Sequence, residues 1–209
     1  MKPMKHALRT SSWIAGTVLA VLLTSTACDS SPDYLDNDHS KDGMSTQQQF
    51  GELLKRPNSD EAQKTYRQVL ADIQAKLADV GLKDWKVGQD ARVDSGCNAF
   101  REVDVHDVAT TYTAWGSPNE VAKGAWPKAT QALTEVAAKH GFTKKGFEVN
   151  KPTYREFHLL DSFGADLTLS SGSNSTTGTS SMLTLKTGCH LSAEAHTRGT
   201  PRSTATPGQ

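Results

Sequence analysis

The sequence predicts an α+β domain in which two helices pack on one face of an antiparallel sheet of about four to six strands. Apolar residues recur at helical spacing in two segments, near residues 58–81 and 126–140. Short strand-like runs separated by turn residues follow each helix, four of them after Phe142. Helices and strands that do not strictly alternate are typical of an α+β arrangement.

The first 27 residues predict a signal peptide. Lys2, Lys5 and Arg9 form a basic head, and an apolar run follows from Trp13 to Leu23. This run is too short for a spanning helix, which needs about 20 apolar residues, and it has the length of a secretory signal. Since residues 25–27 are all small, we expect cleavage before Cys28.

Small residues followed by cysteine are typical of a bacterial lipobox, in which the thiol of Cys28 receives a diacylglycerol. Ser25 stands where the usual pattern has leucine. The alternative is an ordinary secreted protein that is cut after Ala27 and keeps Cys28 as a free or paired thiol. Acylation of Cys28 would leave two of the three cysteines, and these can pair in an oxidising space. The prediction is therefore a protein anchored by lipid to the extracytoplasmic side of the cell membrane.

Residues 28–44 predict a flexible tether. Asp, Ser, Asn, Pro and Gly dominate this segment, so it cannot bury enough apolar surface to offset the entropy of ordering. A flexible chain of this length has a root-mean-square reach of roughly 20 Å.

Two helices are predicted next. Ser45 or Thr46 begins a short one that ends at Arg56-Pro57. The second begins at Asn58, with Glu61 in place for a capping box, and ends at Gly81. Apolar residues at intervals of three or four form one face of the second helix: Ala62, Tyr66, Val69, Leu70, Ile73, Leu77 and Val80.

After Gly81 the pattern changes to short strands with loops between them. Valines and aromatic residues between turn residues predict strands in residues 85–93 and 103–115. A further helix is predicted from Trp126-Pro127 to His140-Gly141, since Pro127 in the first turn has no amide that needs a partner.

Four candidate strands complete the domain, at residues 146–149, 154–160, 165–170 and 181–187. The polar stretch 171–179 predicts a mobile hairpin loop. It contains a formal glycosylation sequon at Asn174, which we discount because a lipobox implies a bacterium.

We therefore expect one folded domain over residues 45–191, followed by a disordered tail over residues 192–209. Loss of Lys2, Lys5 and Arg9 with the signal peptide leaves 20 basic against 23 acidic residues, a net charge of −3. This sign argues against a nucleic-acid partner.

Cys97 and Cys189 are predicted to form a disulfide, because each follows a glycine at the edge of a candidate strand. The bridge would tie the last strand to the segment between the helices. The alternative is two unpaired buried thiols.

Several motifs, in this order and spacing, resemble one known family, the LppA-like lipoproteins of actinobacteria. They are Arg56-Pro57, Tyr66, Trp85, Ser95-Gly96-Cys97, Trp126-Pro127-Lys128-Ala129, His140-Gly141-Phe142, residues 161–165 and residues 187–191. The resemblance implies a cell-envelope lipoprotein on the outer face of the cytoplasmic membrane. The family brings no established reaction, so no catalytic residues are carried over.

No pattern predicts a catalytic, cofactor-binding or metal site. The six histidines of the mature chain form no i, i+4 pair, and the sequence has no nucleophile elbow, Walker loop or dinucleotide fingerprint. His158 and His190 are interpreted as structural histidines.

The remaining polar and aromatic candidates are also interpreted as structural. The carboxylate pairs Asp104 with Asp107 and Glu156 with Asp161 are read as solvated surface residues. Trp85, Trp115 and Trp126 are read as core residues and not as a stacking platform.

Two functions remain open. The first is a non-enzymatic module that binds an envelope protein, lipid or glycan, or serves as an accessory to an envelope complex. The second is an unrecognised hydrolase of cell-wall or lipid substrates, because catalytic groups can come together from distant parts of a sequence.

Overall fold

The computed structural model describes residues 41–93, 97–174 and 179–202. All of them belong to one compact unit of the chain. The predicted signal peptide, Cys28 and most of the predicted tether lie outside the described residues.

Six strands form one antiparallel sheet in the order β1-β2-β6-β5-β4-β3, and a two-residue strand, β7, pairs with the start of β2. The strands are β1 (Lys86–Val93), β2 (Val108–Ser117), β3 (Lys144–Asn150), β4 (Tyr154–Leu160), β5 (Asp166–Asn174), β6 (Thr179–Lys186) and β7 (His190–Leu191).

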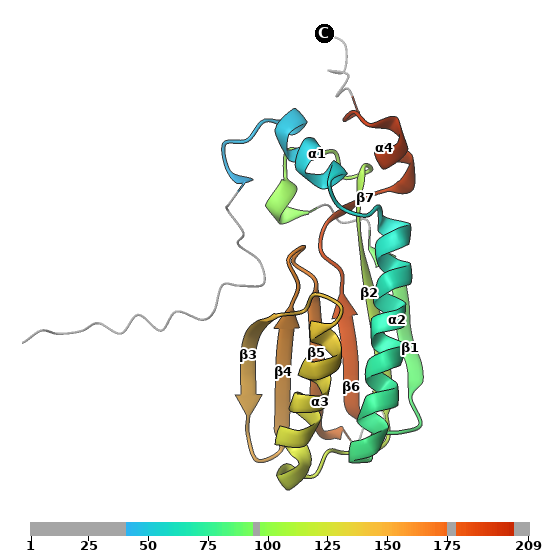
Figure 1. Ribbon diagram of the computed structural model, residues 1–209, viewed down its shortest axis with the longest axis vertical. Helices are drawn as coiled ribbons and strands as arrows, with labels where there is room; N and C mark the ends of the chain where they lie inside the picture. The colour runs from blue at the N-terminus through green and yellow to red at the C-terminus, as the bar shows by residue number, and fades with distance from the viewer. Residues whose placement is uncertain (1–40, 94–96, 175–178, 203–209) are drawn as a thin grey trace, which may run out of the picture. The chain divides into compact units, whose positions relative to one another are not determined.

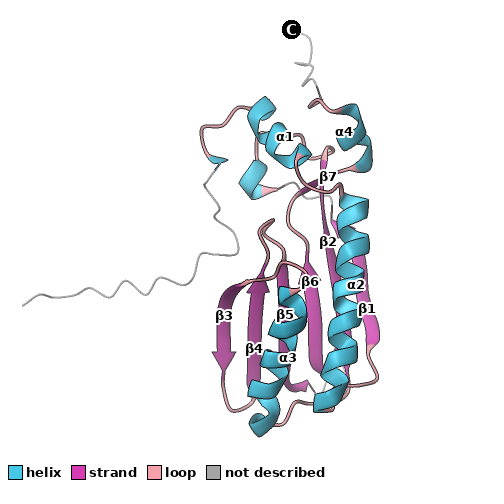
Figure 2. Ribbon diagram, in the orientation of Figure 1, coloured by secondary structure: helices cyan, strands magenta, loops and turns pink. Residues whose placement is uncertain are grey.

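Two helices, α2 (Ser59–Leu77) and α3 (Trp126–Ala138), lie side by side on one face of this sheet (Figure 1, Figure 2). The predicted α+β class, with two helices on one face, is confirmed.

The main core lies between these two helices and the sheet. Strand register aligns Phe157, Leu169, Leu183 and Trp115 in one row across β4, β5, β6 and β2. Because side chains alternate along a strand, the next row on the same face holds Leu159, Leu167 and Leu185. These leucines and Phe157 are buried against the apolar faces of α2 and α3.

Local sequence sets the ends of the helices. Ser45 makes a capping box with Gln48 at α1 (Thr46–Leu54), and Asn58 makes another with Glu61 at α2. After α2, a 3-10 turn, η3 (Ala78–Val80), ends at Gly81, whose φ of +90° favours glycine. The predicted helix at residues 58–81 is therefore an α-helix that tightens in its last turn.

A second, smaller apolar cluster occupies one end of the domain, where α1 and α4 (Ala193–Arg198) lie beside β7 (Figure 1). The short helix η4 (Asn98–Phe100) also contributes. The buried members are Phe50, Leu53, Cys97, Phe100, Val103, Val108, Leu191 and Ala195. This cluster is the reason that the short α1 persists, because an isolated helix of nine residues is marginal in water.

The strand predicted through Val103 and Val105 is wrong. Residues 98–107 form η4 and turns, and the strand begins only at Val108. Asp104 closes the turn, since its carboxylate accepts the N–H of His106 at 2.8 Å and its carbonyl accepts the N–H of Asp107 at 2.9 Å.

The predicted hairpin loop is shorter than residues 171–179. β5 continues to Asn174 and β6 begins at Thr179, so polar residues occupy paired strand positions. Ser171 and Ser181 stand opposite each other, and their hydroxyls are 2.9 Å apart in a buried hydrogen bond. These strand ends are held by backbone pairing and by hydrogen-bonded hydroxyls, and they therefore lack the apolar alternation typical of a strand. Residues 175–178 lie outside the described residues.

The prediction of disorder from residue 192 is also wrong where the structure describes the tail. Ser192 caps α4 by accepting the N–H of Ala195 at 3.1 Å, and Ala195 is fully buried. Composition alone could not reveal this order, because polar contacts hold the segment in place.

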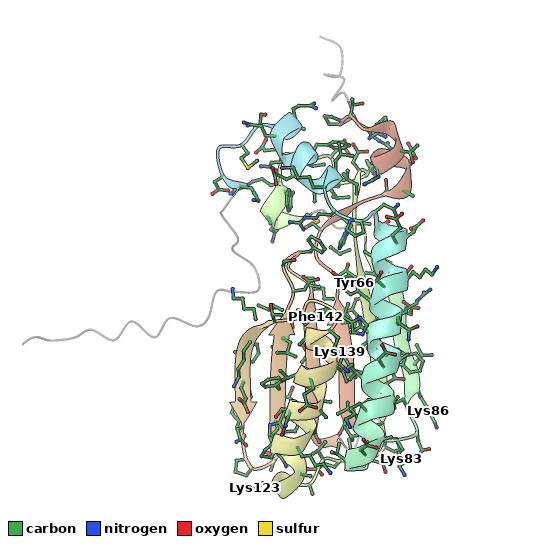
Figure 3. The ribbon with its side chains drawn as sticks, viewed as in Figure 1. Tyr66, Lys83, Lys86, Lys123, Lys139 and Phe142 are labelled. Atoms are coloured by element: carbon green, nitrogen blue, oxygen red, sulfur yellow. A yellow bond between two sulfur atoms is a disulfide. The ribbon has the colours of Figure 1, made fainter. Side chains whose placement is uncertain are left out.

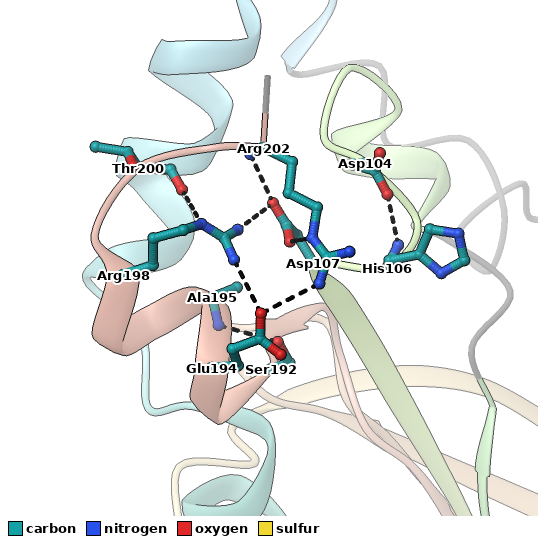
Figure 4. A network of polar contacts seen from close by, with 9 residues as sticks. All are labelled: Asp104, His106, Asp107, Ser192, Glu194, Ala195, Arg198, Thr200 and Arg202. Carbon is teal, nitrogen blue, oxygen red and sulfur yellow. Dashed lines mark hydrogen bonds and ion pairs between the residues drawn. The ribbon is translucent and has the colours of Figure 1, made fainter. Parts of the chain in front are cut away.

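Those contacts converge on Asp107, whose carboxylate is fully buried (Figure 4). Arg198 Nη2 lies 2.6 Å from one of its oxygens, and Arg202 Nε lies 2.9 Å from the other. Glu194 contacts both arginines, at 3.5 and 3.3 Å. The C-terminal segment is thus fastened to the loop that precedes β2.

We predict that Asp107→Asn lowers the free energy of unfolding by about 1–3 kcal/mol, because the ion pair with Arg198 and the charge-assisted hydrogen bond from Arg202 are lost at a buried position. Urea denaturation measures the change. Glu194→Gln alters the exposed carboxylate of the same network and is expected to change stability by less than about 0.5 kcal/mol. Equal losses in the two variants would contradict the assignment of Asp107 as the fastening residue.

Candidate functional site

Cys28, the predicted lipidation site, lies outside the described residues, so its modification stays a prediction. Cys97 and Cys189 are joined by a disulfide, with their Cα atoms 5.8 Å apart. The bond belongs to the smaller apolar cluster and links the segment after β1 to the segment before β7. The predicted pairing is confirmed.

Arg56 holds the region around this disulfide together. Its Nη1 donates to the carbonyl oxygens of Phe163, at 2.9 Å, and of Cys189, at 3.1 Å. The guanidinium carbon lies 4.7 Å from the ring centre of Phe100 and 5.5 Å from that of Phe163. A single cation therefore connects the α1–α2 link with the turn after β4 and with the disulfide.

Asp161 organises that turn. Its Oδ1 accepts the N–H groups of Phe163 and Ala165, both at 2.8 Å, and its Oδ2 accepts the phenol of Tyr66 at 2.5 Å. Burial, together with the Asp161 carboxylate, raises the pKa of Tyr66 far above its usual value. Tyr66 is therefore a protonated hydrogen-bond donor, and its ring also meets Phe142 edge to face (Figure 3).

His190 completes the junction. Its Nδ1 lies 2.9 Å from the carbonyl oxygen of Pro57, and since a carbonyl can only accept, Nδ1 carries the proton. Burial lowers the pKa of His190. Gly188 is required nearby, because a Cβ there would lie 2.0 Å from the carbonyl oxygen of Phe163. His190 is thus a neutral structural histidine.

Several of the motifs that resemble the LppA-like family lie far apart in the sequence but come together around Arg56, Asp161 and His190, a region that we call the junction. They are Arg56-Pro57, Tyr66, residues 161–165 and residues 187–191. Their polar groups mainly contact one another, which indicates that the motifs preserve a folded junction and not a reactive centre.

A second polar cluster lies on the face of the sheet opposite the helices. His158 Nε2 is 2.5 Å from Glu156 Oε1, and His158 Nδ1 is 2.9 and 3.1 Å from the two carboxylate oxygens of Asp166. Phe147 stacks on the imidazole with ring centres 4.0 Å apart, and Thr168 Oγ1 lies 3.2 Å from Asp166 Oδ1. We name Glu156, His158 and Asp166 the histidine–carboxylate cluster.

Electrostatics favour the imidazolium form in this cluster. Burial opposes the charge, but hydrogen bonds to Asp166 and Glu156 outweigh burial and raise the pKa of His158. The phenol of Tyr154 donates a hydrogen bond to Glu156 and so joins this cluster. Burial, and to a lesser extent the Glu156 carboxylate, raises the pKa of Tyr154 to about 12. Both nitrogens of His158 face carboxylates, so the ring is arranged as an ion-pair partner and not as a base awaiting a substrate proton.

The carboxylate pairs weighed in the sequence are not brought together as pairs. Asp107 binds two arginines while Asp104 closes a turn, and Glu156 meets His158 while Asp161 meets Tyr66. Trp126 is buried in the main core, and Trp85 and Trp115 pack against it.

The histidine–carboxylate cluster was not predicted from the sequence. The available signal was the alternation of Glu156 and His158 on one strand, followed by Asp166 and Thr168 on the next.

Two negative findings apply to the described part of the chain. There, no group of three or more histidine, cysteine, aspartate or glutamate side chains could hold a metal ion. No helix in residues 41–93, 97–174 and 179–202 is long and apolar enough to cross a membrane.

Comparisons with known proteins point to one family. The model of the LppA family, described as a lipoprotein confined to pathogenic Mycobacterium, matches residues 36–193. The crystal structure of LppA from Mycobacterium tuberculosis is similar in fold, with a TM-score of 0.50 and 12% sequence identity over 70% of this chain and 86% of that one. No match was found among curated proteins.

We predict that removing the disulfide, as Cys97→Ser with Cys189→Ser, lowers the free energy of unfolding by about 4.5 kcal/mol on the chain-entropy model. The large effect follows from the sequence separation of 92 residues between the two cysteines. Denaturant unfolding of oxidised wild type and of the double variant gives the difference. A loss below about 1 kcal/mol would contradict the model, and wild type under reducing conditions should match the variant.

We predict that the contribution of His158 to stability falls as pH rises. A histidine with a raised folded-state pKa stabilises fully below its unfolded pKa of about 6.5, and this contribution is lost as pH passes the folded pKa. The difference in unfolding free energy between wild type and His158→Gln should therefore be larger at pH 5.5 than at pH 9. His190→Gln serves as a control for the second buried histidine, whose lowered pKa gives the opposite slope. A difference for His158→Gln that does not change with pH would contradict the prediction.

Proposed function

Because the chain belongs to the LppA family of lipoproteins, we propose that it is anchored through a diacylglycerol on Cys28 to the outer face of the cytoplasmic membrane. There its α+β domain acts as a non-enzymatic binding or accessory module. Envelope association follows from the family, while the acylated residue, the membrane side and the role of the domain are parts of the proposal.

The N-terminal sequence supports the anchor. The family match begins at residue 36, eight positions after Cys28, so the predicted lipobox lies just before the matched region. Described structure begins at Lys41, and Gln49 donates to the carbonyl oxygen of Lys41 at 3.2 Å. Residues 29–40 remain as the proposed tether, with a reach of roughly 20 Å, enough to lift the domain off the lipid surface.

The observation that carries the binding-module proposal is the arrangement of His158. In the described domain this histidine is held by carboxylates at both ring nitrogens, and its strand neighbours Tyr154 and Thr168 complete the same hydrogen-bonded line. A general base needs a nitrogen within reach of a substrate proton. The same residues form a rigid, polar patch on one face of the sheet, which suits a binding surface.

We predict that full-length wild-type protein, expressed in a mycobacterial host, incorporates labelled palmitate and loses 27 residues, whereas Cys28→Ala does neither. Acylation requires the thiol, and cleavage of a lipoprotein signal follows acylation. Intact-mass spectrometry reads both changes. Ser25→Leu restores the usual lipobox and is the matched control, with lipidation equal to or above that of wild type. Wild-type protein that is cleaved after Ala27 and carries an unmodified Cys28 would contradict the proposed lipid anchor.

The binding role is tested by crosslinking in intact cells, again with wild type and Cys28→Ala. Recurrent crosslinks from the folded domain to one envelope component, lost in Cys28→Ala, are the expected result. Release of a product from envelope lipids or wall fragments by purified protein, lost in His158→Gln, would overturn the non-enzymatic assignment.

A further inference from the structure

Arg155 on β4 is a buried cation whose donors are only partly used. Its side chain is 3% exposed, and its Nη1 donates to the carbonyl oxygen of Val121 at 3.0 Å. The carboxylate that it faces, Glu120, lies 3.6 Å from Nη2 and is 43% exposed. Arg155 Nε is buried without an acceptor among the described residues. Burying a guanidinium is unfavourable unless its hydrogen bonds are satisfied, so this cation has capacity for another acceptor.

A second unused donor lies beside it. Trp126 is the first residue of α3 and is 3% exposed, yet its indole N–H has no acceptor in the described part of the chain. The guanidinium carbon of Arg155 lies 5.9 Å from the centre of the Trp126 ring. Buried donors without acceptors are rare in folded proteins. Among the six buried side-chain atoms without a hydrogen-bond partner in the described residues, two belong to Arg155 and Trp126, which pack against each other near the start of α3.

The start of α3 lies at the same place and carries no negative charge of its own. The N-cap residue, Ala125, provides no side-chain acceptor, and the first turn holds no acidic residue. The positive end of the helix dipole favours an anion here, but the backbone N–H of Trp126 already donates to the carbonyl oxygen of Lys123, and Pro127 has no N–H. Lys123, labelled in Figure 3, lies in the short helix η5 (Lys123–Ala125) that leads into α3, and its side chain is exposed.

We propose that Arg155, Trp126 and the start of α3 bind an oxyanion of the phosphate class, and that Glu120 is an exchangeable internal occupant of this site. Phosphate oxygens accept hydrogen bonds from guanidinium and indole N–H groups, and the dipole of the helix start favours their negative charge. Glu120 is half-exposed and only loosely paired, so its carboxylate can move aside for a ligand. This inference rests on the proposed role as a binding module, and it does not depend on acylation of Cys28.

The test measures binding of inorganic phosphate to the full chain in neutral detergent micelles by isothermal titration calorimetry, with chloride at equal ionic strength as the reference. We expect saturable binding by wild type. Arg155→Gln should abolish it, and Trp126→Phe, which keeps the ring but loses the N–H, should weaken it. Glu120→Gln removes the competing carboxylate and should tighten it about three- to tenfold.

The gain in Glu120→Gln is the decisive result, because misfolding cannot produce tighter binding. Arg67→Gln is the matched control, since Arg67 is a half-exposed arginine on α2 that pairs with Asp90 at 2.6 Å, and it should bind phosphate as wild type does. No saturable binding by wild type or Glu120→Gln, or an equal loss in Arg67→Gln, would overturn the site. Failure here would leave the palmitate and crosslinking results unaffected.

A second titration identifies the source of the phosphate. Micelles that contain phosphatidylglycerol replace inorganic phosphate as the probe, with the same four variants. Competition between the two probes supports the site and assigns it to a lipid headgroup. Phosphate binding that phosphatidylglycerol does not displace supports the site and assigns it to a free or wall-linked phosphate.

Discussion

The Cys97–Cys189 disulfide and the Arg56 guanidinium together form the constraint on which the end of the domain depends. The main core is closed by α2 and α3 against the sheet, but the smaller cluster has only short helices to cover it. Arg56 reaches the carbonyl oxygens of Phe163 and Cys189, and so couples the turn after β4 to the disulfide. Without that coupling, α1, β7 and α4 would each be too short to order themselves.

Polar groups inside this domain mainly connect segments that lie far apart in the sequence. Asp107 holds the C-terminal segment, Asp161 holds a turn and the Tyr66 phenol, and His158 joins β4 to β5 through Asp166. Asp107 and His158 are buried, and the desolvation penalty of each is offset by charge-assisted contacts with partners that lie nearer the surface. In the described residues, Arg155 and Trp126 form a neighbouring pair of side chains that each keep a buried donor without an acceptor.

Periodicity predicted the helices and most of the sheet because they bury continuous apolar faces. The stripe from Ala62 to Leu77 and the alternating leucines of β5 and β6 report directly on contact with one core. Order in the tail could not be predicted, because Ser192, Arg198 and Arg202 are ordered by a cap and by ion pairs to Asp107, which lies about 90 residues earlier in the sequence. Pairwise polar contacts between distant residues leave no period in a sequence, and this also explains why Arg155 and the histidine–carboxylate cluster were missed.

The position of the oxyanion site on the fold bears on where its ligand comes from. β2 begins beside β7, at the end of the domain that holds α1, and its last residue leads toward the start of α3 (Figure 1). A strand of its length spans about 30 Å, so the site lies at the opposite end of the sheet from the segment that the proposed tether would join. If Cys28 anchors the domain as proposed and the α1 end lies toward the bilayer, the site points away from the membrane. In that orientation a lipid headgroup would reach Arg155 only if the domain turned onto its side, which a flexible tether of roughly 20 Å reach permits. The geometry therefore favours a wall-linked or soluble phosphate over a headgroup in the anchoring membrane.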